Sequence, residues 1–226
     1  MERSSFSEDA RPDEQPLDFA TSLKRLAAAA RTCVNCPLYK HATQTVFGEG
    51  PEKARVVFVG EQPGDQEDLQ GHPFVGPSGK LLDRCLEEAG LDRRQIYITN
   101  AVKHFKWEPA GKRRLHKKPG AREIAACHPW LQAELHLIEP RLVVALGATA
   151  AQALMGPAFR VTKDRGRFLK LEGVGAFMAT VHPSSLLRLA GPDREEQIGQ
   201  FVEDLRKVAG FLRKGRETRI EGEGKR

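Results

Sequence analysis

Short apolar runs alternate with amphipathic stretches along most of the chain. The run Val56-Val57-Phe58-Val59 contains no polar residue and ends at a glycine, which is typical of a buried parallel strand. Strands are expected at residues 55–60, 95–99, 142–147 and 176–181. Helices are expected at residues 18–31, 80–89, 121–138, 148–154 and 195–212. Strands that alternate with helices predict a mostly parallel sheet with helices on both faces.

Polar segments flank this pattern and set the expected domain boundaries. Residues 1–16 are polar and charged, do not resemble a signal peptide, and are expected to be disordered. Residues 213–226 form a charged tail, so one domain is expected at residues 17–212. Residues 161–171 have a polar centre and predict an exposed hairpin. No stretch approaches the roughly 18 apolar residues of a membrane span, so no membrane contact is expected.

The densest basic segment lies at residues 103–118, where seven lysines or arginines accompany one acidic residue. Glycine and proline flank it, so a loop is expected. The net charge of +6 favours a polyanionic partner, nucleic acid first. The candidate phosphate contacts are Lys112, Arg113, Arg114, Lys117 and Lys118. The alternative is an ordinary solvated surface loop.

Polar side chains follow three of the expected strands. Glu61 and Gln62 come directly after the first strand, Asn100 after the second, and His182 after the fourth. Because ligands of parallel sheets bind outside the carboxyl ends of the strands, these side chains are placed where chemistry is usually done. For the first strand, the alternative is an ordinary polar turn.

Phe74 lies in a loop rich in glycine and proline beside the first strand. It can stack on a base there, or it can close the core as a hydrophobic plug. A stacking aromatic, an amide, a histidine and a carboxylate together make a nucleobase pocket and indicate an enzyme that extrudes a base from DNA. The chain contains neither G-x-G-x-x-G nor a P-loop motif, so those nucleotide-binding classes have no support.

Two of the four cysteines, Cys33 and Cys36, form a C-x-x-C pair just past the first expected helix. Such a pair is typical of half a metal or cluster site, or of a redox pair. Cys127 lies in the first half of a long expected helix. Cys85 falls on the apolar face of another helix and is expected to be a small core residue.

Three segments carry a family resemblance. GEQPGDQEDLQGHPFVGPSGKLLD, ITNAVK and HPSSLLR resemble the signature segments of the iron–sulfur uracil-DNA glycosylases, commonly called family 4. The resemblance covers about residues 32–208 in order and at family-like spacing. It implies a DNA repair enzyme with an α/β/α sandwich around a four-stranded parallel sheet.

The resemblance also implies a 4Fe-4S cluster with four protein ligands. Cys33, Cys36 and Cys127 match three of the family's four cysteines. His104 stands where the remaining cysteine is expected, and imidazole can replace thiolate on iron. Cys85 is the rival fourth ligand. The expected role of the cluster is structural.

Two departures from the family pattern resemble its UdgX-type branch, whose members excise uracil and stay covalently attached to DNA through a loop histidine. The opening GEQPG has Gln62 where the family typically has alanine. The insertion KRRLHKKP resembles the KRRIH loop of that branch and places the linking histidine at His116. By resemblance, His116 attacks C1′ of the deoxyribose, Glu61 stabilises the positive charge there and orients or deprotonates His116, and His182 donates to the carbonyl oxygen that becomes anionic.

The remaining site residues are expected to bind the base or support the pocket. By resemblance, Phe74 stacks on uracil and Asn100 bonds its Watson–Crick edge. Gln62 and Asp65 hold the histidine loop or the pocket.

Two other functions stay open at this point. The first is a conventional glycosylase that releases an abasic site and uses His116 only as a DNA contact. The second is a non-catalytic iron–sulfur protein that binds nucleic acid. We expect a monomer in the bacterial cytoplasm, associated with the nucleoid when it is bound to uracil-containing DNA, single- or double-stranded.

Overall fold

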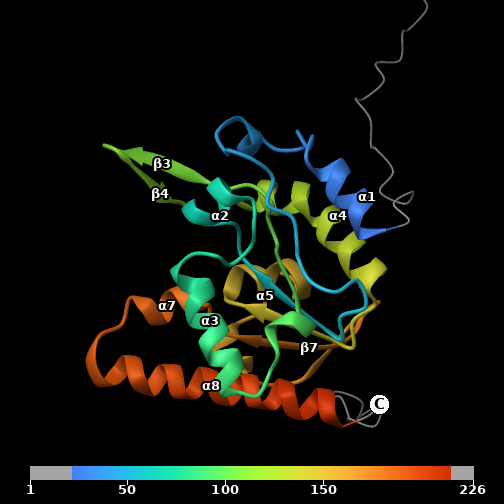
Figure 1. Ribbon diagram of the computed structural model, residues 1–226, viewed down its shortest axis with the longest axis vertical. Helices are drawn as coiled ribbons and strands as arrows, with labels where there is room; N and C mark the ends of the chain where they lie inside the picture. The colour runs from blue at the N-terminus through green and yellow to red at the C-terminus, as the bar shows by residue number, and fades with distance from the viewer. Residues whose placement is uncertain (1–21, 215–226) are drawn as a thin grey trace, which may run out of the picture.

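The computed structural model describes residues 22–214, which are built around one five-stranded sheet (Figure 1). Four strands run parallel in the order β2-β1-β5-β7, and β6 adds an antiparallel edge beside β7. The strands are β1 Val56–Gly60, β2 Tyr97–Asn100, β5 Leu142–Leu146, β6 Leu169–Leu171 and β7 Gly175–Thr180. The α/β class and the parallel four-stranded core are confirmed, and β6 is an addition to them.

Helices cover both faces of the sheet, which gives the expected three layers. One face packs against α3 Pro77–Glu88, α7 Pro183–Leu187 and α8 Gly191–Arg213. The other packs against α4 Ala121–Ile138 and α5 Ala148–Met155, with α1 Leu23–Ala30 beside α4. Side chains of β1 alternate between the two cores: Phe58 lies on the α3 side and Val57 and Val59 on the α4 side. A strand buried on both faces needs a continuous apolar run, which is why the pattern was readable in the sequence.

Besides β6, three α-helices and two strands were not expected from the sequence. They are α2 Asp65–Gln70, α6 Val161–Asp164, α7 Pro183–Leu187, β3 Trp107–Ala110 and β4 Arg113–His116. The basic segment at residues 103–118 therefore contains an antiparallel hairpin rather than only a loop. The expected exposed hairpin at residues 161–171 is wrong. Val161 and Leu171 are buried, and β6 pairs with β7 at the sheet edge instead of folding back on a partner of its own.

The expected boundaries hold best in the middle of the chain. The helix at residues 121–138 has the predicted bounds, whereas α8 begins at Gly191, four residues before the expected start at residue 195. The predicted disordered segment at residues 1–16 lies outside the described residues, as does the tail from residue 215 onward. Within residues 22–214, no helix combines the length and apolarity needed to cross a membrane.

Candidate active site

The carboxyl edge of the sheet opens into a pocket of about 360 Å³. It is lined by Gln62, Gly64, Glu67, Phe74, Ser78, Asn100, His116, His182, Ser184 and Arg188. Residues from three strand ends therefore meet a histidine from the basic hairpin. A larger cavity of about 580 Å³ lies between α4, α5 and the β6–β7 turn and contains none of the expected site residues. We place the candidate site at the strand ends because the chemistry-bearing side chains converge there.

Phe74 and Asn100 form one wall of this pocket and meet at Gly60. A Cβ atom at Gly60 would lie 2.3 Å from Asn100 Oδ1 and 2.6 Å from the Phe74 ring, so only glycine fits there. Asn100 is 2% exposed, and its Oδ1 has no hydrogen-bond partner among residues 22–214. Phe74 is held in the left-handed region (φ 58°), which is strained for a bulky residue and recurs at binding sites. A buried acceptor without a partner beside an ordered aromatic ring is suited to a planar ligand with an N–H group.

His182 faces Phe74 across the pocket, with ring centroids 5.9 Å apart. The backbone N–H of Ser184 donates to His182 Nδ1 at 3.1 Å, which assigns the ring proton of the neutral imidazole to Nε2. Desolvation lowers the pKa of His182 to about 4, and the charges of His116 and Arg188 act in the same direction. His182 is therefore a neutral hydrogen-bond donor near pH 7.

Glu61 lies beside His116 and is tied to a residue that the sequence analysis missed. The Thr149 hydroxyl, near the start of α5, donates to Glu61 Oε2. The other carboxylate oxygen, Oε1, is 3.5 Å from His116 Nε2. Thr149 could have been found by applying the strand-end rule to the third strand, because it follows Gly147 by two positions.

The β3–β4 hairpin, which extends from the body of the protein in Figure 1, delivers His116 to the pocket. Gln62 pins both ends of the hairpin: its Oε1 accepts from the Lys106 N–H at 3.2 Å, and its Nε2 donates to the Lys117 carbonyl at 2.9 Å. These backbone partners fix the orientation of the amide. Gln62 Nε2 also lies 2.9 Å from His116 Nε2, so the amide faces that imidazole nitrogen with N–H rather than with oxygen.

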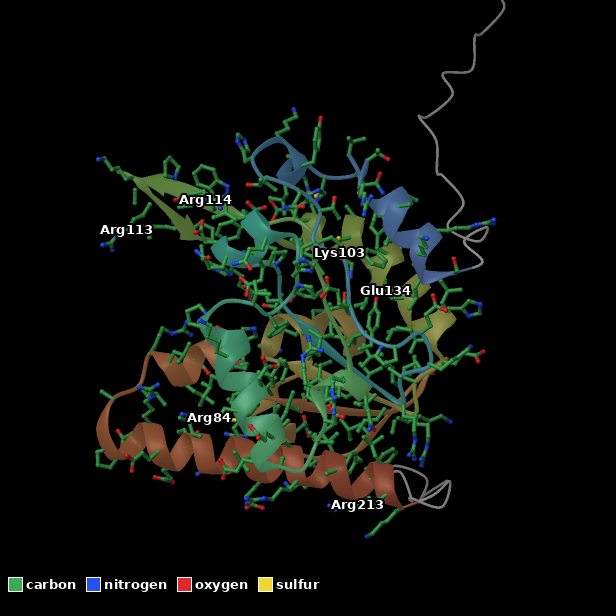
Figure 2. All side chains as sticks on the ribbon, viewed as in Figure 1. Arg84, Lys103, Arg113, Arg114, Glu134 and Arg213 are labelled. Atoms are coloured by element: carbon green, nitrogen blue, oxygen red, sulfur yellow. The ribbon has the colours of Figure 1, made fainter. Side chains whose placement is uncertain are left out.

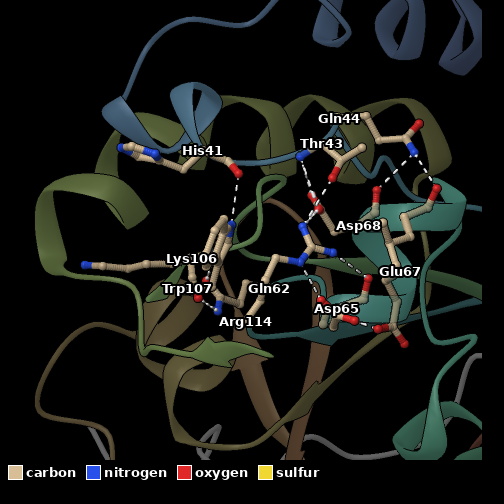
Figure 3. Close-up of polar contacts among 12 residues, drawn as sticks. His41, Thr43, Gln44, Gln62, Asp65, Glu67, Asp68, Lys106, Trp107 and Arg114 are labelled. Atoms are coloured by element: carbon tan, nitrogen blue, oxygen red, sulfur yellow. Dashed lines mark hydrogen bonds and ion pairs between the residues drawn. The ribbon is translucent and has the colours of Figure 1, made fainter. Parts of the chain in front are cut away.

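Arg114 clamps the hairpin to α2 (Figure 3). Its Nε donates to Asp65 Oδ1 and its Nη1 to the fully buried Asp68, both at 2.6 Å. Asp68 also accepts from the Thr43 N–H, which ties the clamp to the segment after the C-x-x-C pair. The expectation that Arg114 contacts phosphate is therefore corrected: its guanidinium points into the protein because two carboxylates bind it there. Asp65 lies against the hairpin, as a support for the histidine loop requires.

Comparison with known proteins agrees with this geometry. Residues 47–206 match the family model of the "Uracil DNA glycosylase superfamily". The chain belongs to the uracil DNA glycosylase superfamily. It is 40% identical over 186 residues to a type-4 uracil-DNA glycosylase of Thermotoga maritima, covering 81% of this chain and 91% of that protein. It is 33% identical over 204 residues to the type-4 enzyme of Archaeoglobus fulgidus (87% and 96%) and 29% identical over 186 residues to a type-5 enzyme of Thermus thermophilus (74% and 81%).

In this superfamily member, the thiols of Cys33, Cys36 and Cys127 share one small core between α1 and α4. The Trp130 indole N–H donates to Cys33 Sγ and the Lys103 N–H to Cys127 Sγ, both at 3.2 Å. Burial raises the pKa of Cys127 to about 12, and the charge of Lys103 opposes that shift. Among the described residues, however, no three His, Cys, Asp or Glu side chains adopt a metal-binding arrangement. The cluster therefore remains a proposal.

The two rival candidates for the fourth ligand lie in different places. His104 is buried, its Nε2 lies 3.0 Å from the Thr45 hydroxyl, and desolvation lowers its pKa. Cys85 is buried in the other core, with the leucines of α3, and burial raises its pKa. Cys85 thus packs on the opposite face of the sheet from Cys127, which agrees with its interpretation as a core residue.

A buried ion pair joins the segment that follows β2 to α4, and Figure 2 labels its two residues. Lys103 Nζ lies 2.5 Å from Glu134 Oε2, and the two side chains are 1% and 0% exposed. The ammonium also donates to the Asn100 carbonyl at 2.8 Å, and Glu134 accepts from the Tyr97 hydroxyl at 2.9 Å. This pair was not expected from the sequence, because Lys103 was counted among the cations of the expected loop.

Of the other five cations of the basic segment, Lys106 is partly buried and pairs with Glu123 at 2.8 Å, and four face solvent. Lys112, Arg113, Lys117 and Lys118 are exposed, and Figure 2 places Arg113 on the outer part of the hairpin. Lys117, directly after β4, pairs with Glu108 of β3 at 2.8 Å. An exposed, cationic hairpin beside a pocket is suited to a phosphate backbone.

Proposed function

We propose that this chain is a DNA repair enzyme that excises uracil from DNA and is then captured as a covalent adduct through His116. One observation carries the proposal: His116 lines the pocket at the strand ends, with its Nε2 3.5 Å from Glu61 Oε1 and 2.9 Å from Gln62 Nε2. The similarity to the type-4 uracil-DNA glycosylases supports the excision step. The clamped hairpin supports the capture step.

Uracil recognition is assigned to Asn100 and Phe74. The unpartnered Oδ1 of Asn100 can accept from the N3–H of uracil, and the ordered Phe74 ring can stack on the base. Cytosine has no N3–H and would leave that buried acceptor without a partner. Such a mismatch costs roughly 1–3 kcal/mol, so this contact selects uracil.

Bond cleavage is assigned to His182 and Glu61. The C1′–N1 bond breaks and its electron pair leaves with uracil, whose carbonyl oxygen accepts from the Nε2–H of the neutral His182. The Glu61 carboxylate stabilises the positive charge that develops near C1′. Because His182 is neutral, it stabilises the departing uracil anion by hydrogen bonding and keeps its Nε2 proton.

Capture follows because an imidazole replaces water at C1′. The Gln62 amide N–H faces His116 Nε2, which favours the neutral tautomer with a lone pair on Nε2 and the proton on Nδ1. The Gln62 N–H can turn to the Lys106 carbonyl, 3.2 Å from Gln62 Nε2, which frees that lone pair to form the bond to C1′. The ring becomes cationic beside Glu61, and the Nδ1 proton then passes to solvent. A nucleophile fixed in place has a high effective concentration and outcompetes water.

The hairpin must be rigid for this competition to succeed. Gln62 and the Arg114–Asp65 ion pair hold it against the body of the protein. The exposed cations around His116 bind the DNA backbone of single- or double-stranded substrates. They are Lys112, Arg113, Lys117 and Lys118.

We also propose a 4Fe-4S cluster held by Cys33, Cys36, Cys127 and His104. The shared core of the three thiols and the N–H···S hydrogen bonds fit thiolate ligands. When bound, the cluster would hold the C-x-x-C segment against α4. No step of the reaction depends on it.

The test uses a uracil-containing single-stranded oligonucleotide with the full-length protein, followed by denaturation with detergent and heat and gel electrophoresis. The proposal expects a heat-stable shifted band in the wild type that is absent in His116→Ala. Abasic DNA without a shifted band would identify a conventional glycosylase. If neither abasic DNA nor a shifted band forms, the chain is a non-catalytic binding protein.

A further inference from the structure

We propose that Thr149 is a positioning residue that sets the orientation of the Glu61 carboxylate for both excision and capture. This inference rests on the proposed function. Thr149 does not line the pocket, no sequence motif singled it out, and it acts only through Glu61.

The two oxygens of Glu61 have different partners. Oε2 accepts from the Thr149 hydroxyl, whereas Oε1 faces His116 Nε2 at 3.5 Å. The Glu61 side chain is only 22% exposed, so water competes weakly for the carboxylate. A carboxylate held at one oxygen cannot rotate freely about its last torsion, and the other oxygen stays directed toward the reacting carbon and the nucleophile.

Thr149 is itself held rigidly. Its side chain is 4% exposed, and it lies in the first turn of α5, which begins after Gly147. The Gly147 N–H donates to the Thr180 carbonyl at 2.9 Å, which ties this turn to the end of β7. Gly147 has a φ of +91°, and a Cβ atom there would lie 3.0 Å from the Cβ of His182. One turn therefore contacts both His182, through Gly147, and Glu61, through Thr149.

This arrangement gives the turn between β5 and α5 a specific task. It fixes Glu61, the anionic side chain assigned to the sugar, and packs against His182, the neutral hydrogen-bond donor assigned to the base. The reacting bond lies between sugar and base. We therefore expect loss of the Thr149 hydroxyl to slow bond cleavage itself, not only the fate of the sugar afterwards.

The decisive comparison is Thr149→Ser with Thr149→Ala, because these variants differ by one hydroxyl group. Ala148, Ala150 and Ala151 flank the position, so alanine is tolerated by the helix. Thr149→Val is the isosteric variant that lacks the hydroxyl. The single-turnover rate constant for uracil release and the yield of covalent adduct are measured with excess protein at saturation. Melting temperature reports folding.

We expect Thr149→Ala and Thr149→Val to lower the rate constant about tenfold, in line with the loss of one hydrogen bond to a charged group. Thr149→Ser should stay within about threefold of wild type, since it keeps the donor. Tyr97→Phe is the matched control: it removes another buried hydroxyl that donates to a carboxylate, at Glu134 (2.9 Å) and not at Glu61. It should lower the melting temperature and leave the rate constant unchanged.

Two results would overturn the inference: equal rate constants for the serine and alanine variants, or a rate loss in Tyr97→Phe as large as that in Thr149→Val. If Thr149→Val does not fold, the serine and alanine pair decides. A wild-type protein that neither releases uracil nor forms an adduct would refute the proposed function instead. Failure of the inference and failure of the proposed function are therefore distinguishable.

Discussion

The buried Lys103–Glu134 pair gives the largest stability effect that we predict for a single side chain outside the apolar core. Both charges are removed from water, and at an effective dielectric constant of about 20, unit charges about 4 Å apart attract by about 4 kcal/mol. Lys103→Met leaves Glu134 buried without its cation. We expect this variant to lower the free energy of unfolding by about 3–5 kcal/mol.

The double variant Lys103→Met/Glu134→Gln separates the pair from its surroundings. The glutamine oxygen can still accept from the Tyr97 hydroxyl, and no charge is left buried. The double variant should therefore recover at least about 2 kcal/mol of the loss. Urea unfolding followed by circular dichroism measures all three proteins.

A matched control uses the exposed pair of Lys117 and Glu108, whose side chains are 45% and 61% exposed. Lys117→Met should cost less than about 1 kcal/mol. The electrostatic explanation is refuted if Lys103→Met costs no more than this control, or if the double variant is no more stable than Lys103→Met alone. The first result would mean that water reaches the pair, and the second that the two charges are not coupled.

Three further predictions follow from the pocket and the hairpin. Gly60→Ala should reduce the rate of uracil excision at least about a hundredfold, because the added Cβ would clash with Asn100 Oδ1. The control Gly199→Ala in α8, which has open space at that position, should leave the rate unchanged in the same activity assay. Arg114→Lys should raise the released abasic fraction without slowing uracil release, whereas Arg113→Lys should not; equal gel patterns would refute the clamp. As the pH falls from 7.5 to 5.5, the wild type should lose about 1 kcal/mol of its free energy of unfolding through His182. The cause is that His182 gains a proton below about pH 6.5 in the unfolded chain but only near pH 4 in the folded chain. Urea unfolding of His182→Gln should therefore show a shallower pH dependence.

The buried parallel strands were predictable because a strand covered on both faces must be apolar throughout, as β1 and β5 are. The strand-end rule then found Glu61, Asn100 and His182. The β3–β4 hairpin escaped because its strands have four residues each and are stabilised by side chains from elsewhere, chiefly Asp68 and Gln62. Those long-range partners leave no periodic signal in the segment itself.

Lys103 and Arg114 were misjudged for a related reason. Composition treats every cation of a basic segment alike, although burial and acidic partners separate them. Lys103 lies inside the protein with Glu134, and Arg114 lies on the inner face of the hairpin. Lys106 is partly buried beside Glu123, and Lys112, Arg113, Lys117 and Lys118 are exposed to solvent. Partners 31 and 46 residues away along the chain made the difference, and no local pattern encodes them.

The alternation of β4 has a consequence for the fidelity of folding. Arg114 and His116 share one face of this strand, and Arg113 and Leu115 share the other. A slip of one residue would present arginine to the acidic side chains of α2 again, but leucine instead of histidine to the sugar. The ion pairs of an arginine with α2 therefore cannot by themselves distinguish the observed strand register from the shifted one, which has no histidine at the pocket. Gln62 selects the register, because its amide hydrogen-bonds to the Lys106 N–H and the Lys117 carbonyl, and these two groups are in place for only one alignment of the strands.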